Sequence, residues 1–300
     1  MKYSELPYER VDVEKTRNLM KEYLEKFSNA ESFNEQANVI LDVNKQNKEY
    51  HSYAAMASLN FSRNIYDEDA KAEKDYYDSI GPDMIEISDL FEKAVVQSKY
   101  KDELSKKWGE KFLIDIETSL KTFDPKIKEM LKEETDLRNE YTKLTAGAKI
   151  TYKGKEYNLA GLGPFHSNED RNVRKASIEA RFHWFSENSE ALDDIYDKLV
   201  KLRHKIATTL GYDNFIELGY MRMGRTDYGP NEVANFRKQI VNHVVPIVKK
   251  LVEKKKDILG LDHLYFYDGI NFKEGDPKPK GSPDHLIKEA QLMYRELSNE

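Results

Sequence analysis

A catalytic zinc ion is commonly held by two histidines four residues apart on one helix, with a glutamate between them as the base. The seven histidines are His51, His166, His183, His204, His243, His263 and His285. No two of them stand four residues apart, so the sequence contains no His-Glu-x-x-His motif. It also contains no cysteine, which removes thiolate catalysis, disulfides and cysteine-based zinc sites. We therefore assign no catalytic and no metal-binding residue within this sequence.

Three weaker candidates for chemistry remain, each with a structural alternative. Glu179, His183 and Glu187 stand at i, i+4 and i+8 of a predicted helix. They form either a metal-binding face or, as suits two acids and one histidine better, a solvated face with ion pairs. His166, in "GPFHSNEDR", is either a general base in a loop or an exposed histidine beside a helix start. Asp268, in "YFYDGINF", is either a functional acid among aromatic residues or part of an Asp-Gly turn.

The composition argues against several classes of protein. Asp and Glu number 54 against 48 Lys and Arg, a net charge of -6, which argues against a general nucleic-acid binder. There is no Gly-x-Gly-x-x-Gly, no phosphate-loop motif and no Gly-x-Ser-x-Gly elbow. No apolar run approaches the roughly 20 residues of a membrane span, and the N-terminus has no secretion signal. We expect a cytoplasmic protein that binds neither nucleic acid nor a membrane.

Sequence signals for helices dominate the chain, so helices must position these side chains. Asp12 is a predicted N-cap, and Ser32 forms a capping box with Glu35. Asp124-Pro125 and Ser282-Pro283 each place an N-cap before a proline at the first helical position. Apolar residues at steps of three and four form helix faces; they are Leu192, Ile195, Leu199, Leu202 and Ile206, and in a second segment Val241, Val244, Val245, Val248, Leu251 and Val252.

One stretch departs from the helical pattern. The segment "AKITYKGKEYNLAGL" alternates apolar and polar residues, contains β-branched residues and has Lys153-Gly154 at its centre. This pattern predicts a short hairpin. We therefore predict a mainly α fold, a multi-helix array with one short β-hairpin near 148–160. A change of pattern near Ser189 predicts an N-terminal helical domain at 1–188, which includes the hairpin, and a second helical domain at 189–300.

Several segments, taken in order, resemble the oligoendopeptidase F family, the thimet-oligopeptidase-like zinc metallopeptidases. They are "ITYKGKEYNLAGLGPF", "NEDRNVRKASIEARFHWFSEN", "IYDKLVKLRHKIATTLGYDNFIEL", "LGYDNFIELGYMRMGRTDYGPNEVANFRKQIVNHVVPIVKKL" and "LDHLYFYDGINF". The resemblance covers Ile150 to the end well and the first half more loosely. No segment is a catalytic signature, and it is their order and combined length that make the match specific.

The resemblance implies an almost wholly helical peptidase whose two halves flank a channel that admits short peptides. Arg222, Arg225, Tyr228 and Asp268 are then the candidates for lining the substrate channel. The family's zinc ligands, a His-Glu-x-x-His motif and a further glutamate, would follow residue 300, so the segment 189–300 would be the start of the catalytic domain. Zinc and a C-terminal half are thus implied for the intact parent enzyme, and neither bound zinc nor peptide cleavage for residues 1–300.

Two interpretations of the whole protein follow. In the first, the chain is the N-terminal portion of a zinc-dependent oligoendopeptidase that hydrolyses short peptides. In the second, it is a catalytically silent helical protein that binds peptides or acts as a scaffold. The last predicted helix carries an apolar stripe that needs a partner helix, which favours the first interpretation; the stripe is Leu286, Ala290, Met293 and Leu297.

Overall fold

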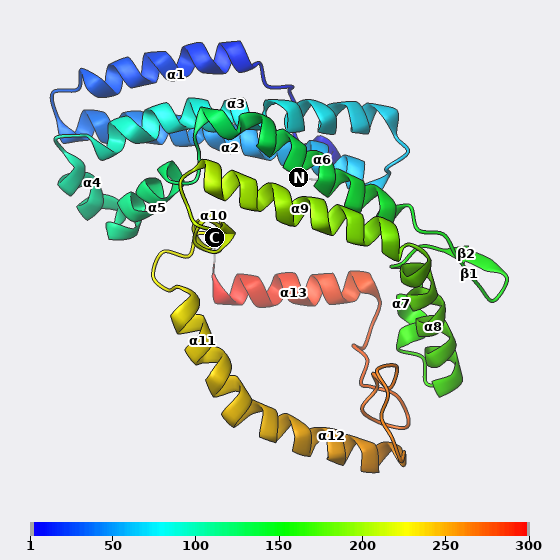
Figure 1. The fold of residues 1–300 in the computed structure, drawn as a ribbon. Coiled ribbons are helices and arrows are strands. Elements are labelled where there is room, and N and C mark those ends of the chain that lie inside the picture. Colours follow the sequence, from blue (N-terminus) through cyan, green and yellow to red (C-terminus); the bar gives the residue numbers. More distant parts are fainter. Residues whose placement is uncertain (1–2, 299–300) are drawn as a thin grey trace. The chain divides into compact units, whose positions relative to one another are not determined.

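The computed structural model describes residues 3–298, which are mostly helical (Figure 1). This confirms the predicted mainly α fold. By its internal contacts the chain divides into two compact units. Unit 1 consists of Met1–Ala148 with Ser186–Lys238, and unit 2 of Lys149–Phe185 with Gln239–Glu300. Each unit therefore combines two separated stretches of chain, and the domain boundary predicted between 188 and 189 stays a prediction.

Two long helices of unit 1 begin where the sequence places capping side chains. The Asp12 carboxylate accepts a hydrogen bond from the Lys15 N–H, and the Ser32 hydroxyl accepts one from the Glu35 N–H. The helices are α1 (Val13–Ser28), α2 (Phe33–Arg63), α3 (Glu68–Val96), α4 (Lys101–Trp108), α5 (Glu110–Leu120), α6 (Lys128–Ala146), α9 (Ser189–Thr209), α10 (Phe215–Arg222) and α11 (Pro230–Gln239). None of the helices within residues 3–298 is long and apolar enough to span a membrane.

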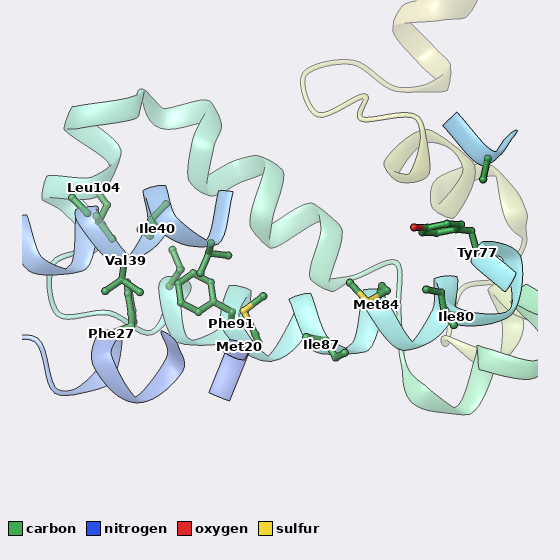
Figure 2. Close-up of a cluster of buried hydrophobic side chains, with 14 residues drawn as sticks. Met20, Phe27, Val39, Ile40, Tyr77, Ile80, Met84, Ile87, Phe91 and Leu104 are labelled. Atoms are coloured by element: carbon green, nitrogen blue, oxygen red, sulfur yellow. The ribbon is translucent and has the colours of Figure 1, made fainter. Parts of the chain in front are cut away.

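The larger core of unit 1 lies where α1, α2 and α3 meet, and Leu104 of α4 joins it (Figure 2). Its labelled members are Met20, Phe27, Val39, Ile40, Tyr77, Ile80, Met84, Ile87, Phe91 and Leu104. Each large apolar side chain buried in this way stabilises the fold by about 1.5–3 kcal/mol. Inside this core the rings of Phe27 and Phe91 pack edge to face, with centroids 5.2 Å apart.

A second core cluster joins α6, α9 and α10. It comprises Phe123, Ile127, Leu137, Leu202, Ile206, Ala207 and Leu218. Leu202 and Ile206 belong to the apolar face predicted for this segment, and that face does lie in the cluster. Because Leu218 of α10 is fully buried in the same cluster, this core fixes α10 against α9.

Unit 2 contains the hairpin. Its strands are β1 (Ile150–Tyr152) and β2 (Lys155–Tyr157), which pair antiparallel with Ile150 opposite Tyr157. Lys153 and Gly154 both have positive φ angles, of 50° and 74°, as a two-residue hairpin turn requires. The predicted hairpin and its turn are therefore confirmed. The helices of unit 2 are α7 (Gly163–His166), α8 (Arg171–Glu187), α12 (Val245–Leu259), which follows a π-helical turn at Ile240–Val244, and α13 (Pro283–Leu297).

Candidate functional site

The turn after α10 determines where Arg225 lies. At the start of α10, the Asn214 side chain accepts a hydrogen bond from the Ile216 N–H at 2.8 Å. At its end, Gly224 takes the left-handed conformation with a φ angle of 65°. The Arg225 N–H then bonds back to the Tyr220 carbonyl oxygen at 3.1 Å. Because a side chain at position 224 would strain this backbone, glycine is what returns Arg225 to the side of Tyr220.

Arg222 is held by a buried carboxylate. Glu134 of α6 is only 3% exposed, and its Oε1 and Oε2 accept hydrogen bonds from Arg203 Nε and Arg222 Nη2, each at 2.7 Å. Both guanidinium groups also lie 5.8 Å from the ring centroid of Phe215. Burial acts to raise the pKa of Glu134, but the charge of Arg222 and the hydrogen bonds of both arginines lower it overall. This ion triad joins α6, α9 and α10.

Arg225 lies beside two tyrosine rings and has no carboxylate partner among the described residues. Its guanidinium carbon is 5.0 Å from the ring centroid of Tyr220 and 5.6 Å from that of Tyr228. The two rings are themselves in edge-to-face contact, 6.5 Å apart. Within residues 3–298, no acidic group forms an ion pair with Arg225. Its planar donors are therefore oriented by the rings and remain available to an anionic ligand.

Asp268 lies in unit 2, and its side chain is completely buried. Arg171 binds it with two hydrogen bonds, from Nε to Oδ1 at 2.8 Å and from Nη2 to Oδ2 at 2.9 Å. The Tyr265 N–H donates to Oδ2 at 2.9 Å, and Arg174 Nη2 to Oδ1 at 3.4 Å. The hydrogen bonds from Arg171 lower the pKa of Asp268 to about 2, although burial opposes the shift. All of this carboxylate's bonding capacity is thus used inside the protein.

The same cluster fixes the aromatic segment around Asp268 to α8. Arg174, 2% exposed, donates to the carbonyl oxygens of Asn168, Glu169 and Tyr267 at 2.8–3.0 Å. The rings of Tyr265 and Tyr267 stack with an angle of 8° between them, and Arg171 lies over both. The Asp268 N–H also bonds to the Tyr265 carbonyl oxygen at 2.8 Å, as in a turn. Asp268 is therefore both a turn residue and a buried acid.

The structure also places the two histidine candidates. His166 is half-buried at the end of α7, and its buried Nε2 has no hydrogen-bond partner in the described part of the chain. Burial, and then the charge of Arg181, lower the pKa of His166. His183 lies on α8 with Glu179 and Glu187, as predicted. Within residues 3–298, however, no group of three or more His, Asp or Glu side chains could hold a metal ion, so the described residues do not fit a zinc site.

The sequence did not predict which residues hold Arg222 and Asp268. The acid that holds Arg222 is Glu134, and the bases that hold Asp268 are Arg171 and Arg174. One signal was present, because arginines at i and i+3 share one helix face and are suited to a common carboxylate. Arg222, at the end of α10, and Arg225 and Tyr228, in the loop that follows, belong to unit 1, while Asp268 belongs to unit 2. Their assignment to a substrate channel stays a prediction.

Comparison with known proteins gives two family matches. Residues 3–123 match the peptidase M3 N-terminal domain, and residues 165–285 match peptidase family M3. The comparison with curated proteins returned no match.

Several solved structures are similar to the chain over its whole length. A structure described as an oligoendopeptidase F has 38% sequence identity and a TM-score of 0.93 over 100% of this chain. A PZ peptidase A solved with an inhibitor has 40% identity and a TM-score of 0.93 over 99%. An oligoendopeptidase F from Bacillus anthracis str. Ames has 35% identity and a TM-score of 0.92 over 99%. The chain spans only 53%, 53% and 55% of these three structures, about half of their length.

Proposed function

Because the chain belongs to peptidase family M3 as an oligoendopeptidase F-like member, we propose that it is the N-terminal part of a zinc-dependent oligoendopeptidase. In this proposal the enzyme hydrolyses short peptides in the cytoplasm, and its zinc ligands follow residue 300. The observation that carries the proposal is the match of the whole chain to about half of each oligoendopeptidase structure. The described residues contain no group that could hold a metal ion, and in our proposal they contribute to substrate binding.

The exposed apolar faces of unit 2 support the presence of a further part of the protein. On α12 and α13 the exposed apolar side chains include Ile247, Leu251, Ile287, Leu292, Met293 and Leu297, which are 50–75% exposed. Helix faces with this many exposed apolar side chains are typical of an interface. In our proposal, the C-terminal half of the same enzyme covers these faces.

The proposed contribution of unit 1 to substrate binding rests on Arg225. Arg222 already has a carboxylate partner in Glu134. The guanidinium of Arg225 has none in the part of the chain that the structure describes, and it is oriented by Tyr220 and Tyr228. A guanidinium oriented in this way suits the carboxylate at the end of a short peptide. We assign Arg222, with Tyr228, to the wall of the channel and Arg225 to contact with the substrate, while Asp268 supports unit 2 from within.

The proposed function is tested by comparing two forms of the protein. We expect residues 1–300 to bind no catalytic zinc and to cleave no peptide. The protein made from the complete reading frame should bind zinc and cleave a fluorogenic short peptide, and a chelator should abolish the cleavage. Zinc content is measured by atomic absorption alongside the assay. Chelator-sensitive cleavage by residues 1–300 would contradict the proposal, and peptide binding without cleavage by the complete protein would favour the silent peptide-binding alternative.

Replacing Arg225 by glutamine in the cleaving protein should raise KM about tenfold for a peptide with a free C-terminal carboxylate. The reason is that the variant removes the charge facing the peptide but no internal ion pair. The same peptide with an amidated C-terminus should show little change. Arg237→Gln, at an exposed position on α11, is the control. An equal rise in KM for both peptides would show that Arg225 does not recognise the carboxylate.

A further inference from the structure

Unit 1 contains a cavity that neither the peptidase chemistry nor the Arg225 site uses. Its volume is about 400 Å³, and it lies between α2, α3 and the segment from the end of α5 to Phe123. Cavities of this size hold small molecules in other proteins. One part of the wall is apolar, with Met84 and Phe123, and another part is acidic, with Asp89 and Glu92. The cavity is thus suited to a ligand with one charged and one apolar end.

The two acids of the cavity are not equally neutralised. Asp89 is 7% exposed and pairs with Lys93 Nζ at 2.6 Å. Glu92 forms no ion pair within residues 3–298 and is hydrogen-bonded by the Ser119 side chain. Burial, helped by the negative charge of Asp89 and opposed by that hydrogen bond, raises the pKa of Glu92 to about 7. Glu92 is therefore partly protonated near pH 7, and the positive charge of a cationic ligand would favour its ionised form.

We propose that this cavity binds a small primary ammonium ion with an apolar body. The ammonium lies against Glu92 and Asp89, which present the carboxylates, and the body lies against Met84 and Phe123. An ammonium suits the site better than a metal ion, because the described residues contain no group of three or more His, Asp or Glu side chains that could hold a metal ion. An amine also gains from the aromatic wall, where its apolar body is removed from water.

Gly81 keeps the cavity open. It lies inside α3 and lines the cavity, and a Cβ atom added there would meet no atom within 4 Å. Glycine is unfavourable in a helix by about 1 kcal/mol relative to alanine. Position 81 thus has open space beside it at the lining of the cavity, so a larger side chain placed there is a test of ligand access.

The experiment measures the binding of 2-phenylethylamine to the 300-residue chain by calorimetry, with the neutral isostere 2-phenylethanol as its control. We expect the amine to bind saturably and the alcohol at least about tenfold more weakly, because the alcohol makes no ion pair. Glu92→Gln should weaken amine binding by about tenfold or more. Glu117→Gln, which removes an exposed carboxylate from α5, should leave it unchanged.

The pH dependence of amine binding provides a second readout. Because Glu92 must be ionised to pair with the ammonium, affinity should rise about tenfold from about pH 6 to about pH 8. The other titratable groups on the cavity wall are Tyr50 and His51 of α2 and Asp89 of α3, and α5 contributes none. In Glu92→Gln the rise should disappear, which separates the role of Glu92 from any contribution of His51.

Blocking the cavity provides the final test. Gly81→Leu should abolish amine binding while the protein stays folded, as thermal unfolding would show. Binding of the free amine would show that the ligand is a small-molecule amine. Binding of the tripeptide Phe-Ala-Ala instead would show that the ligand is the N-terminus of a peptide. Binding of neither ligand, equal binding of the alcohol, or full binding by Gly81→Leu or Glu92→Gln would each overturn the proposal.

Discussion

Replacing Asp268 by asparagine is expected to lower the free energy of unfolding of unit 2 by about 3–5 kcal/mol. Asparagine keeps the shape of the side chain but removes the charge that Arg171 and Arg174 share. Arg174 is 2% exposed, so solvent cannot replace the lost partner. The measurement is urea unfolding followed by the fluorescence of Trp184, which is buried in α8 of unit 2. Trp108, the other tryptophan, is first replaced by phenylalanine so that only unit 2 is observed.

The control for this variant is an exposed ion pair on the same helix. Lys175 and Glu179 are 3.7 Å apart and both more than half exposed, so Glu179→Gln should change the free energy of unfolding by less than about 0.5 kcal/mol. If Asp268→Asn had an equally small effect, the buried cluster would not stabilise unit 2.

The effect of Asp268 should also depend on pH. Its pKa in the folded protein is about 2, below the ordinary value of 3.8. The carboxylate therefore stabilises the fold above about pH 4, and the contribution is lost as the pH falls towards about 2. The difference in free energy of unfolding between the natural chain and Asp268→Asn should accordingly shrink on acidification. A difference that stays constant between about pH 5 and about pH 3 would mean that the charge is not what stabilises this cluster.

Replacing Glu134 by glutamine should lower the free energy of unfolding of unit 1 by about 2–3 kcal/mol. The variant removes the one charge that Arg203 and Arg222 both contact. The expected loss is smaller than for Asp268, because both arginine side chains are partly exposed, at 37% and 29%, so water partly replaces their partner, whereas Arg174 beside Asp268 is buried. Here Trp184 is replaced by phenylalanine, and Trp108, which packs against the core of unit 1, reports the transition.

A neighbouring acid on α6 provides the matched control for Glu134. Glu133 is the preceding residue and is exposed, so Glu133→Gln should leave the transition almost unchanged. A shift of equal size in both variants would indicate a general effect of helix charge on α6. In that case the triad would have no special role in joining α6 to α9 and α10.

Features with local causes could be predicted from the sequence. The hairpin turn at Lys153-Gly154 depends on two adjacent residues with positive φ angles. The caps at Asp12 and Ser32 bond to N–H groups three residues away. The apolar steps of the segment around Leu202 likewise identify the face of α9 that is buried. Each of these depends on interactions whose partners lie within one or two helical turns.

The partners of the site residues could not be predicted in the same way. Glu134 and Arg222 are 88 positions apart in the sequence, and Arg171 and Asp268 are 97 apart. A sequence with 54 acidic and 48 basic residues offers far too many possible pairs for composition to select one. Only the packing of helices determines which acid is buried beside which arginine. The resemblance to a peptidase family predicted the fold correctly, but it could not supply these pairings.

The division of unit 2 between two distant stretches of chain has a consequence for its synthesis. Arg171 and Arg174 leave the ribosome well before Asp268, which follows Arg171 by 97 positions. At the usual rate of about 5–20 residues per second, this gap lasts roughly 5 to 20 s. Throughout that time the two arginines have no carboxylate from the later stretch, while unit 1 gains its own last helices. The buried cluster of unit 2 can therefore form only after its second stretch has been made.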